Sequence, residues 1–224
     1  MEIAGLYILA YLVGSFPTAY IIGKAIKGVD IRVYGSGNVG GTNVFYHVGK
    51  KWAVFLGVFE ILVKGAGPFW IGHYVLGLDR SSVLLLIAPL LAVIGHNWSV
   101  FLKFQGGRGI AVGIGTLLAL SPILFVAFFV VAFCGWALTR SSGVWVLIGL
   151  TLTPVWAVLI GDPAMVSYYC LGLVGLIVLK RLLSNWTPLP EGLPRAKVLF
   201  NRLFRDRDVD DHAEWVLRVP HGTK

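Results

Sequence analysis

The chain has 224 residues, of which 57% are hydrophobic and 13% charged, and its mean hydropathy is +0.79. This is more apolar surface than one soluble core of that length can bury, so the composition excludes an ordinary soluble domain and predicts a membrane protein. The net charge of +8 does not indicate nucleic-acid binding, because the basic residues are spread over loops between apolar stretches. That distribution is typical of cytoplasmic loops facing anionic lipid headgroups.

Apolar stretches cover residues 3–23, 52–77, 82–102, 110–138 and 141–179. The N-terminal one follows an acid instead of basic residues, which predicts a first spanning helix and not a signal peptide. Because a span needs about 20 residues, the last two stretches are too long for one helix each. Breaks at Ser121-Pro122 and Gly161-Asp162-Pro163 divide them. We therefore predict an all-α, polytopic bundle of about seven transmembrane helices, with the fourth and fifth short.

The lysines and arginines predict the orientation. With an odd number of spans and the N-terminus outside, 17 of the 19 basic residues fall on the inner side. We expect a cytoplasmic C-terminus, and a multi-pass protein of the plasma (cell inner) membrane whose polar loops face the cytoplasm. Residues 1–185 are predicted to form the membrane domain and residues 186–224 a polar cytoplasmic tail. Within that tail, residues 196–205 show an amphipathic pattern that suits the inner leaflet, and a partly ordered tail is the alternative.

The first polar loop, residues 28–51, is rich in glycine, serine, threonine and asparagine. Glycines permit the close backbone approach by which successive N–H groups bind an anion, and the polar side chains add neutral donors. A phosphate cradle and a flexible linker both fit this composition. The residues concerned are Gly35, Ser36, Gly37, Asn38, Gly40, Gly41, Thr42 and Asn43.

The second polar loop places Gly106, Gly107 and Gly109 around Arg108, with Lys103 nearby. A cation among glycines just before a helix start combines backbone donors, a helix dipole and a full charge, which favours a phosphate site. An ordinary basic loop with a glycine turn is the alternative. The loop lacks the Walker pattern and the strand-turn-helix setting of a dinucleotide site.

Three further side chains are candidates for chemistry inside the membrane. Glu60 and Lys64 are four apart in the second span, so they are predicted to form an ion pair, either structural or in a charged wall of the site. His96 is a candidate general base, the alternative being a structural histidine bonded to a backbone carbonyl. Cys134 and Cys170 lie in apolar runs without partners at metal spacing, and we expect both to be small core residues.

Four motifs in order resemble the bacterial acyl-phosphate:glycerol-3-phosphate acyltransferases (PlsY type): SFPTAY, DIRVYGSGNVGGTN, an acid with KG four residues later, and GHNWSVFLKFQGGRG. The resemblance covers Ser15 to Asn185 and leaves the tail outside. It implies that a fatty acyl group moves from acyl phosphate to the sn-1 hydroxyl of glycerol 3-phosphate, forming lysophosphatidic acid for phospholipid biosynthesis. It also implies that no metal, cofactor or coenzyme A takes part.

The resemblance assigns roles to single residues. It implies catalytic roles for Ser36 and Arg108, to which we add His96 as the candidate base. The expected substrate or phosphate contacts are Gly35, Gly37, Asn38, Gly40, Thr42, Asn43, Lys64, Lys103, Gly106, Gly107 and Asn185. The chain departs from the family pattern at Tyr46 (usually Arg), Glu60 (the acid of span two), Ser99 (usually Pro), Arg108 (usually Lys) and Leu182 (usually His). A changed acceptor, a small transporter or a non-catalytic lipid- or acyl-phosphate-binding paralogue are the alternatives.

Overall fold

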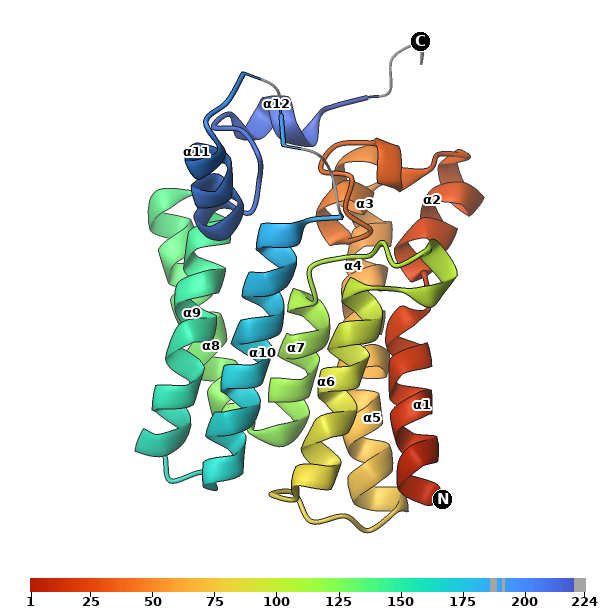
Figure 1. The fold of residues 1–224 in the computed structure, drawn as a ribbon, viewed down its shortest axis with the longest axis vertical. Coiled ribbons are helices and arrows are strands. Elements are labelled where there is room, and N and C mark those ends of the chain that lie inside the picture. Colours follow the sequence, from red (N-terminus) through yellow and green to blue (C-terminus); the bar gives the residue numbers. More distant parts are fainter. Residues whose placement is uncertain (186–188, 191, 220–224) are drawn as a thin grey trace.

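The computed structural model describes residues 1–185, 189–190 and 192–219, and its regular elements there are all helical. The helices run up and down a single bundle, with the N-terminus at one end and the tail helices at the other (Figure 1). Among the described residues, five helical segments are long and apolar enough to cross a membrane: Glu2–Lys27, Lys50–Val75, Pro122–Thr139, Ser142–Leu159 and Ala164–Leu183. Two shorter apolar helices, Val83–Asn97 and Ile110–Leu120, lie among them.

The elements follow one another in a simple order. They are α1 (Glu2–Ser15), α2 (Thr18–Lys27), η1 (Ile31–Val33), α3 (Gly41–His47), α4 (Lys50–Phe59), η2 (Glu60–Ala66), α5 (Gly67–Trp70), η3 (Ile71–Val75), α6 (Val83–Asn97), η4 (Val100–Leu102), α7 (Ile110–Leu120), α8 (Pro122–Thr139), α9 (Ser142–Leu159), α10 (Ala164–Leu183), α11 (Arg195–Phe200), η5 (Asn201–Arg205) and α12 (His212–Val216). The helix that begins as α4 continues through η2, α5 and η3, with wide π-helical turns at η2 and η3.

The predicted breaks are confirmed at Ser121-Pro122 and at residues 161–163, where α7 and α9 end. The predicted first span matches the candidate membrane segment Glu2–Lys27, but this segment is not one continuous helix. α1 ends at Ser15, and α2 starts at Thr18 beyond the extended Phe16. Pro17 causes this break, because it restricts the residue before it to extended conformations and cannot donate a helical hydrogen bond.

The third stretch also ends earlier than predicted. α6 stops at Asn97 and not near residue 102, since Ser99 leaves the helix to pair its backbone with Gln105. In the resulting tight turn, the Ser99 hydroxyl donates a hydrogen bond to the backbone carbonyl of Ser15. This turn fixes the second polar loop against the end of α1.

The bundle buries an apolar core and exposes apolar side chains outward. Leu85, Leu117 and Leu150 are fully buried, whereas Phe129 and Phe133 on α8 are about half exposed. Large apolar side chains on the outside suit lipid contact. The prediction for Cys170 is confirmed, but the one for Cys134 is wrong, because Cys134 lies on the exposed face of α8.

η2 and α7 approach so closely that neither can carry a larger side chain at the contact. A Cβ on Gly115 would clash with the backbone of Ile61. We expect Gly115→Val to destabilise the protein by about 1 to 3 kcal/mol, the range found for overpacked cores. Gly175→Ala is the matched control, since that glycine faces open space on α10 and alanine favours helices. Thermal unfolding in detergent measures both, and an unchanged Gly115→Val protein would contradict this packing.

Candidate active site

A cavity of about 270 Å³ lies at the end of the bundle that carries the tail, where α3 and α7 begin. Its polar wall comes from the two glycine-rich loops, and its apolar wall comes from η2 and α7. The lining residues are Ser36, Asn38, Gly40, Gly41, Thr42, Asn43, Glu60, Ile61, His96, Arg108, Gly109, Ile110, Ala111, Ile114, Asp206 and Trp215. The structure thus brings the two predicted loops together.

Asn43 holds the first loop in shape. Its amide nitrogen donates to the carbonyls of Ile31, Tyr34 and Asn38, at 3.1, 2.9 and 2.9 Å. Its amide oxygen accepts from the backbone N–H and the hydroxyl of Ser36, both at 3.1 Å. Asn43 is 1% exposed, so its amide organises the cradle from inside and leaves the Ser36 hydroxyl at the cavity wall.

The start of this loop is fixed by a local ion pair. Asp30 accepts from the backbone N–H of Arg32 at 3.0 Å and pairs with its guanidinium at 2.7 Å. The hydrogen bond from Arg32 lowers the pKa of the Asp30 carboxyl below its ordinary value. Tyr46, which stands where the family usually has arginine, is exposed and packs its ring against His212 of the tail.

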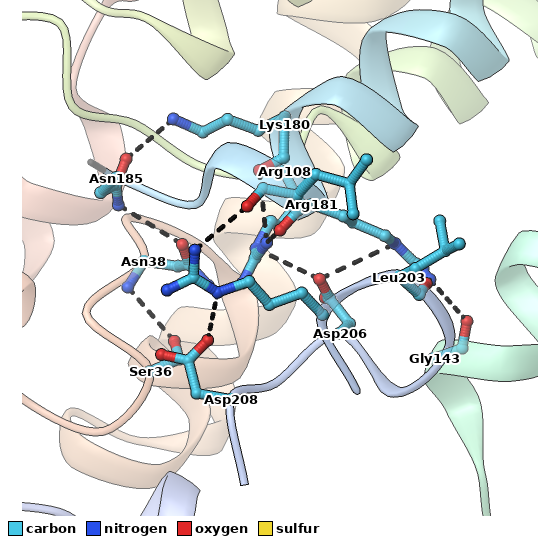
Figure 2. Close-up of polar contacts among 12 residues, drawn as sticks. Ser36, Asn38, Arg108, Gly143, Lys180, Arg181, Asn185, Leu203, Asp206 and Asp208 are labelled. Atoms are coloured by element: carbon cyan, nitrogen blue, oxygen red, sulfur yellow. Dashed lines mark hydrogen bonds and ion pairs between the residues drawn. The ribbon is translucent and has the colours of Figure 1, made fainter. Parts of the chain in front are cut away.

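Arg108 lies between the first loop, α10 and the tail (Figure 2). Its Nη1 donates to the carbonyl of Arg181 at 3.2 Å. Nε and Nη2 lie 2.9 and 3.0 Å from the side-chain oxygen of Asn38, in the amide orientation that pairs these groups. Nε also lies 3.2 Å from a carboxylate oxygen of Asp206. The side chain is 8% exposed, so the cation is held at the cavity by groups from three parts of the chain.

Asn185 joins both loops to the end of α10. Its amide nitrogen donates to the carbonyls of Gly37 and Gly106, each at 3.1 Å. Its oxygen accepts from the N–H of Gly106 at 3.0 Å and from the ammonium of Lys180 at 2.8 Å. Lys180 is fully buried and also lies 5.3 Å from the centre of the Trp98 ring. Asn185 thus links the two loops to α10 and is not among the residues that line the cavity, and its predicted substrate contact stays a prediction.

Glu60 connects the predicted ion pair to the candidate base. One of its carboxylate oxygens lies 3.5 Å from Nζ of Lys64 and 3.4 Å from Nδ1 of His96. The predicted Glu60–Lys64 pair is confirmed, and the His96 ring faces the same carboxylate. Glu60 and His96 reach the main cavity, whereas Lys64 lines only a cleft of about 10 Å³ behind it.

The predicted site residues divide into three groups. Those at the cavity surface are Ser36, Asn38, Gly40, Thr42, Asn43, His96 and Arg108. Residues outside the cavity surface form the second group: Lys64, Gly106 and Gly107 line the small cleft, and Asn185 is bonded to Gly106. Gly35 and Gly37 belong to this group too, and their positive φ values of 50° and 69° turn the first loop. Lys103 is exposed and lies outside the cavity.

Sequence reasoning missed Lys180, Arg181, Asp206 and Trp215. Lys180 and Arg181 could have been noticed, because they are consecutive cations at the end of an apolar span, five and four residues before Asn185. The tail residues had no such signal, because RDRDVDD is typical of a solvated segment. Asp206 and Trp215 nevertheless line the cavity.

The polar end of the cavity suits an anion. Gly40–Asn43 at the start of α3 and Gly109–Ala111 at the start of α7 line it, and the first N–H groups of a helix have no acceptor within that helix. These donors, the dipole of α7 and the Arg108 cation act in the same direction. Together they can hold a phosphate group.

The fold and this cavity define a polytopic membrane protein with a pocket for a phosphorylated ligand. Residues 4–191 match the family described as glycerol-3-phosphate acyltransferase. The chain belongs to this family, and it is a membrane acyltransferase that acts on glycerol 3-phosphate.

Named relatives agree with this assignment. The chain is 34% identical over 215 residues to glycerol-3-phosphate acyltransferase 4 of Dehalococcoides mccartyi (strain CBDB1), covering 93% of this chain and 90% of the relative. It is 37% identical over 175 residues to glycerol-3-phosphate acyltransferase 3 of Bacillus anthracis, covering 78% and 85%. The crystal structure of PlsY (YgiH), an integral membrane glycerol 3-phosphate acyltransferase in its glycerol 3-phosphate form, is similar with a TM-score of 0.77 and 29% identity, covering 96% and 98%.

Proposed function

We propose that this acyltransferase uses an acyl phosphate as its donor and acylates the sn-1 hydroxyl of glycerol 3-phosphate, forming lysophosphatidic acid and inorganic phosphate. The observation that carries the proposal is the two-sided cavity. Arg108 and the starts of α3 and α7 form one wall, suited to phosphate, while Ile61, Ile110 and Ile114 form an apolar wall. An acyl phosphate has both kinds of surface, joined at the reacting carbonyl.

The chemistry needs positioning more than a protein nucleophile. The glycerol hydroxyl oxygen attacks the acyl carbon, the bond from that carbon to the phosphate oxygen breaks, and the hydroxyl proton passes to phosphate or water. Because phosphate in a mixed anhydride is a good leaving group, binding both substrates in line and stabilising the departing charge supply much of the rate. We assign Arg108, Asn38 and the Ser36 hydroxyl to the phosphates.

His96 is the proposed alternative proton acceptor. Its ring lies at the cavity wall with Nδ1 toward Glu60, an arrangement that orients an imidazole for proton transfer. Lys103, exposed at the same end of the bundle, is placed to attract anionic headgroups instead of binding substrate inside.

Lysophosphatidic acid formation tests this proposal. Purified protein in detergent is incubated with glycerol 3-phosphate and either palmitoyl phosphate or palmitoyl coenzyme A. We expect lysophosphatidic acid from palmitoyl phosphate and none from palmitoyl coenzyme A. With palmitoyl phosphate, the Ser36→Ala variant should form much less product than the wild-type protein. Turnover without a membrane barrier also separates an enzyme from a transporter. Product from the coenzyme A ester, or none from the acyl phosphate, would refute the proposed donor.

The polar end of the bundle is proposed to face the cytoplasm of the cell, and the chain to cross the membrane seven times with its N-terminus outside. Residues 1–185 then form the membrane domain and residues 186–224 a cytoplasmic tail. The excess of basic residues at this end supports it. Single cysteines at Ser81 and at Lys103, in a protein in which Cys134 and Cys170 are both replaced, test it in intact cells. A membrane-impermeant thiol reagent should label Ser81→Cys and spare Lys103→Cys, and the reverse pattern would invert the topology.

A further inference from the structure

The C-terminal segment 192–219 lies across the end of the bundle that holds the cavity (Figure 1). At one edge, the carbonyls of Arg218 and Val216 accept from the N–H of Gly35 and from Nε2 of His47, both at 2.8 Å. At the other edge, the Leu203 carbonyl accepts from Nη1 of Arg181 at 2.8 Å. The segment is therefore attached to the first loop near its C-terminal end and to α10 through η5.

The predicted membrane-surface helix of the tail belongs to this attachment. α11 and η5 bury Val198, Asn201 and Arg202, and η5 packs on α9 and α10. The Arg202 guanidinium donates to the carbonyl of Leu182 at 3.1 Å and pairs with Asp208 at 2.6 Å. One face of this helical segment thus packs on the bundle. Neither prediction for residues 196–205, a helix on the inner leaflet or a partly ordered tail, included this contact.

Between the two attachments, Asp206 faces two buried arginines (Figure 2). Its carboxylate lies 3.2 Å from Nε of Arg108 and 3.7 Å from Nε of Arg181. Arg181 is fully buried. Two like charges in one buried region repel, and a carboxylate between them offsets that repulsion. The Asp206 carboxylate therefore allows the two positively charged side chains of Arg108 and Arg181 to lie in the same buried region.

Arginine at position 108 meets Asp206 in a way that lysine could not. A guanidinium carries an Nε–H in a rigid planar fork, whereas an ammonium has no donor at that point of the side chain. Nε faces the Asn38 oxygen at 2.9 Å, and the Asp206 carboxylate lies 3.2 Å from the same atom, so an opposite charge stands beside this edge of the guanidinium. The carboxylate also sets the plane of the fork, and with it the direction in which Arg108 meets the cavity.

We propose that the C-terminal segment is a wall of the active site, and that Asp206 is a positioning residue that orients Arg108 for the substrate phosphate. Trp215 forms the other part of this wall. The proposal rests on the proposed function, because it takes Arg108 as a phosphate-binding residue. Asp206 itself touches no substrate in this mechanism and acts through the arginine.

A double-mutant cycle tests the proposal in the full-length enzyme. Asp206→Asn is made in the wild-type and Arg108→Lys proteins, and kcat and KM for palmitoyl phosphate and glycerol 3-phosphate are measured. In the wild-type background we expect kcat to fall about 10- to 100-fold, since small misplacements of a positioning group cost that much. In the Arg108→Lys background, which has no Nε–H to hold, we expect a change of at most about twofold.

Asp210→Asn is the matched control. Asp210 pairs with Lys197 and Arg205 on the outside of the tail and does not line the cavity. Its kcat should stay within about twofold of wild type. If Arg108→Lys has no turnover, the coupling is measured from the thermal unfolding temperatures of the four proteins. Asp206→Asn removes the pairing with Arg181 in both backgrounds, and it should lower that temperature further when residue 108 is arginine.

Two results would overturn the proposal: wild-type kcat in Asp206→Asn, or equal losses in both backgrounds, which would mean that Asp206 only attaches the tail. Failure of the proposed function is distinguishable, because the wild-type protein would then form no lysophosphatidic acid at all.

Discussion

Arg108→Ala is expected to lower kcat/KM for lysophosphatidic acid formation by about 100-fold or more. Arg108 lines the cavity beside the start of α7, and its guanidinium contacts Asn38 of the first loop. Removing a fixed charge aimed at a departing anion typically raises the barrier by about 3 kcal/mol, which is roughly 100-fold or more in rate. The loss should appear mainly in kcat, because the charge on the phosphate grows as the acyl bond breaks.

Arg108→Lys separates charge from geometry. It retains the cation found in the usual family pattern but loses the planar fork, so we expect activity between those of wild type and Arg108→Ala. Arg140→Ala is the control, since Arg140 is an exposed arginine over the Trp136 ring. Initial rates with palmitoyl phosphate measure all three. An Arg108→Ala enzyme within about fivefold of wild type would remove Arg108 from the catalytic site.

The helix breaks and the polar loops could be predicted because their signals are local. Pro122 and Pro163 end helices by their own chemistry, and the basic residues indicate which loops share a side. Pro17 has the same chemistry, yet its apolar neighbours concealed the break when only hydropathy was considered. The break matters for the site, because the chain beyond it forms α2, which leads directly into the first loop.

The roles of individual side chains were less predictable, because they depend on contacts between distant parts of the chain. Asn43 and Asn185 are residue types common in ligand-binding sites, but the amide nitrogens of both donate to backbone carbonyls of the polar loops. Asp206 is one of several acids in the tail, and only its place across the cavity distinguishes it from Asp210. No local pattern contains that information.

The buried pair in η2 leads to the second large expected effect. Glu60 and Lys64 expose only 4% and 3% of their side chains, and the same carboxylate faces His96. Glu60→Ala would leave the Lys64 ammonium in an apolar interior with its carboxylate partner removed. Breaking a buried ion pair from one side typically costs about 3 to 5 kcal/mol of unfolding free energy. We expect a loss of that size, measured by chemical unfolding in detergent followed by circular dichroism.

A double substitution shows whether the uncompensated charge causes the loss. Glu60→Gln with Lys64→Met removes both charges and keeps the side-chain lengths, so it should recover most of the stability lost in Glu60→Ala. Glu2→Ala, at the exposed N-terminus, controls for the loss of one acid. Equal destabilisation in the single and double variants would show that the uncompensated Lys64 charge is not the cause. The double variant should still have reduced turnover, because the carboxylate that orients His96 at the cavity wall is absent even when the bundle is stable.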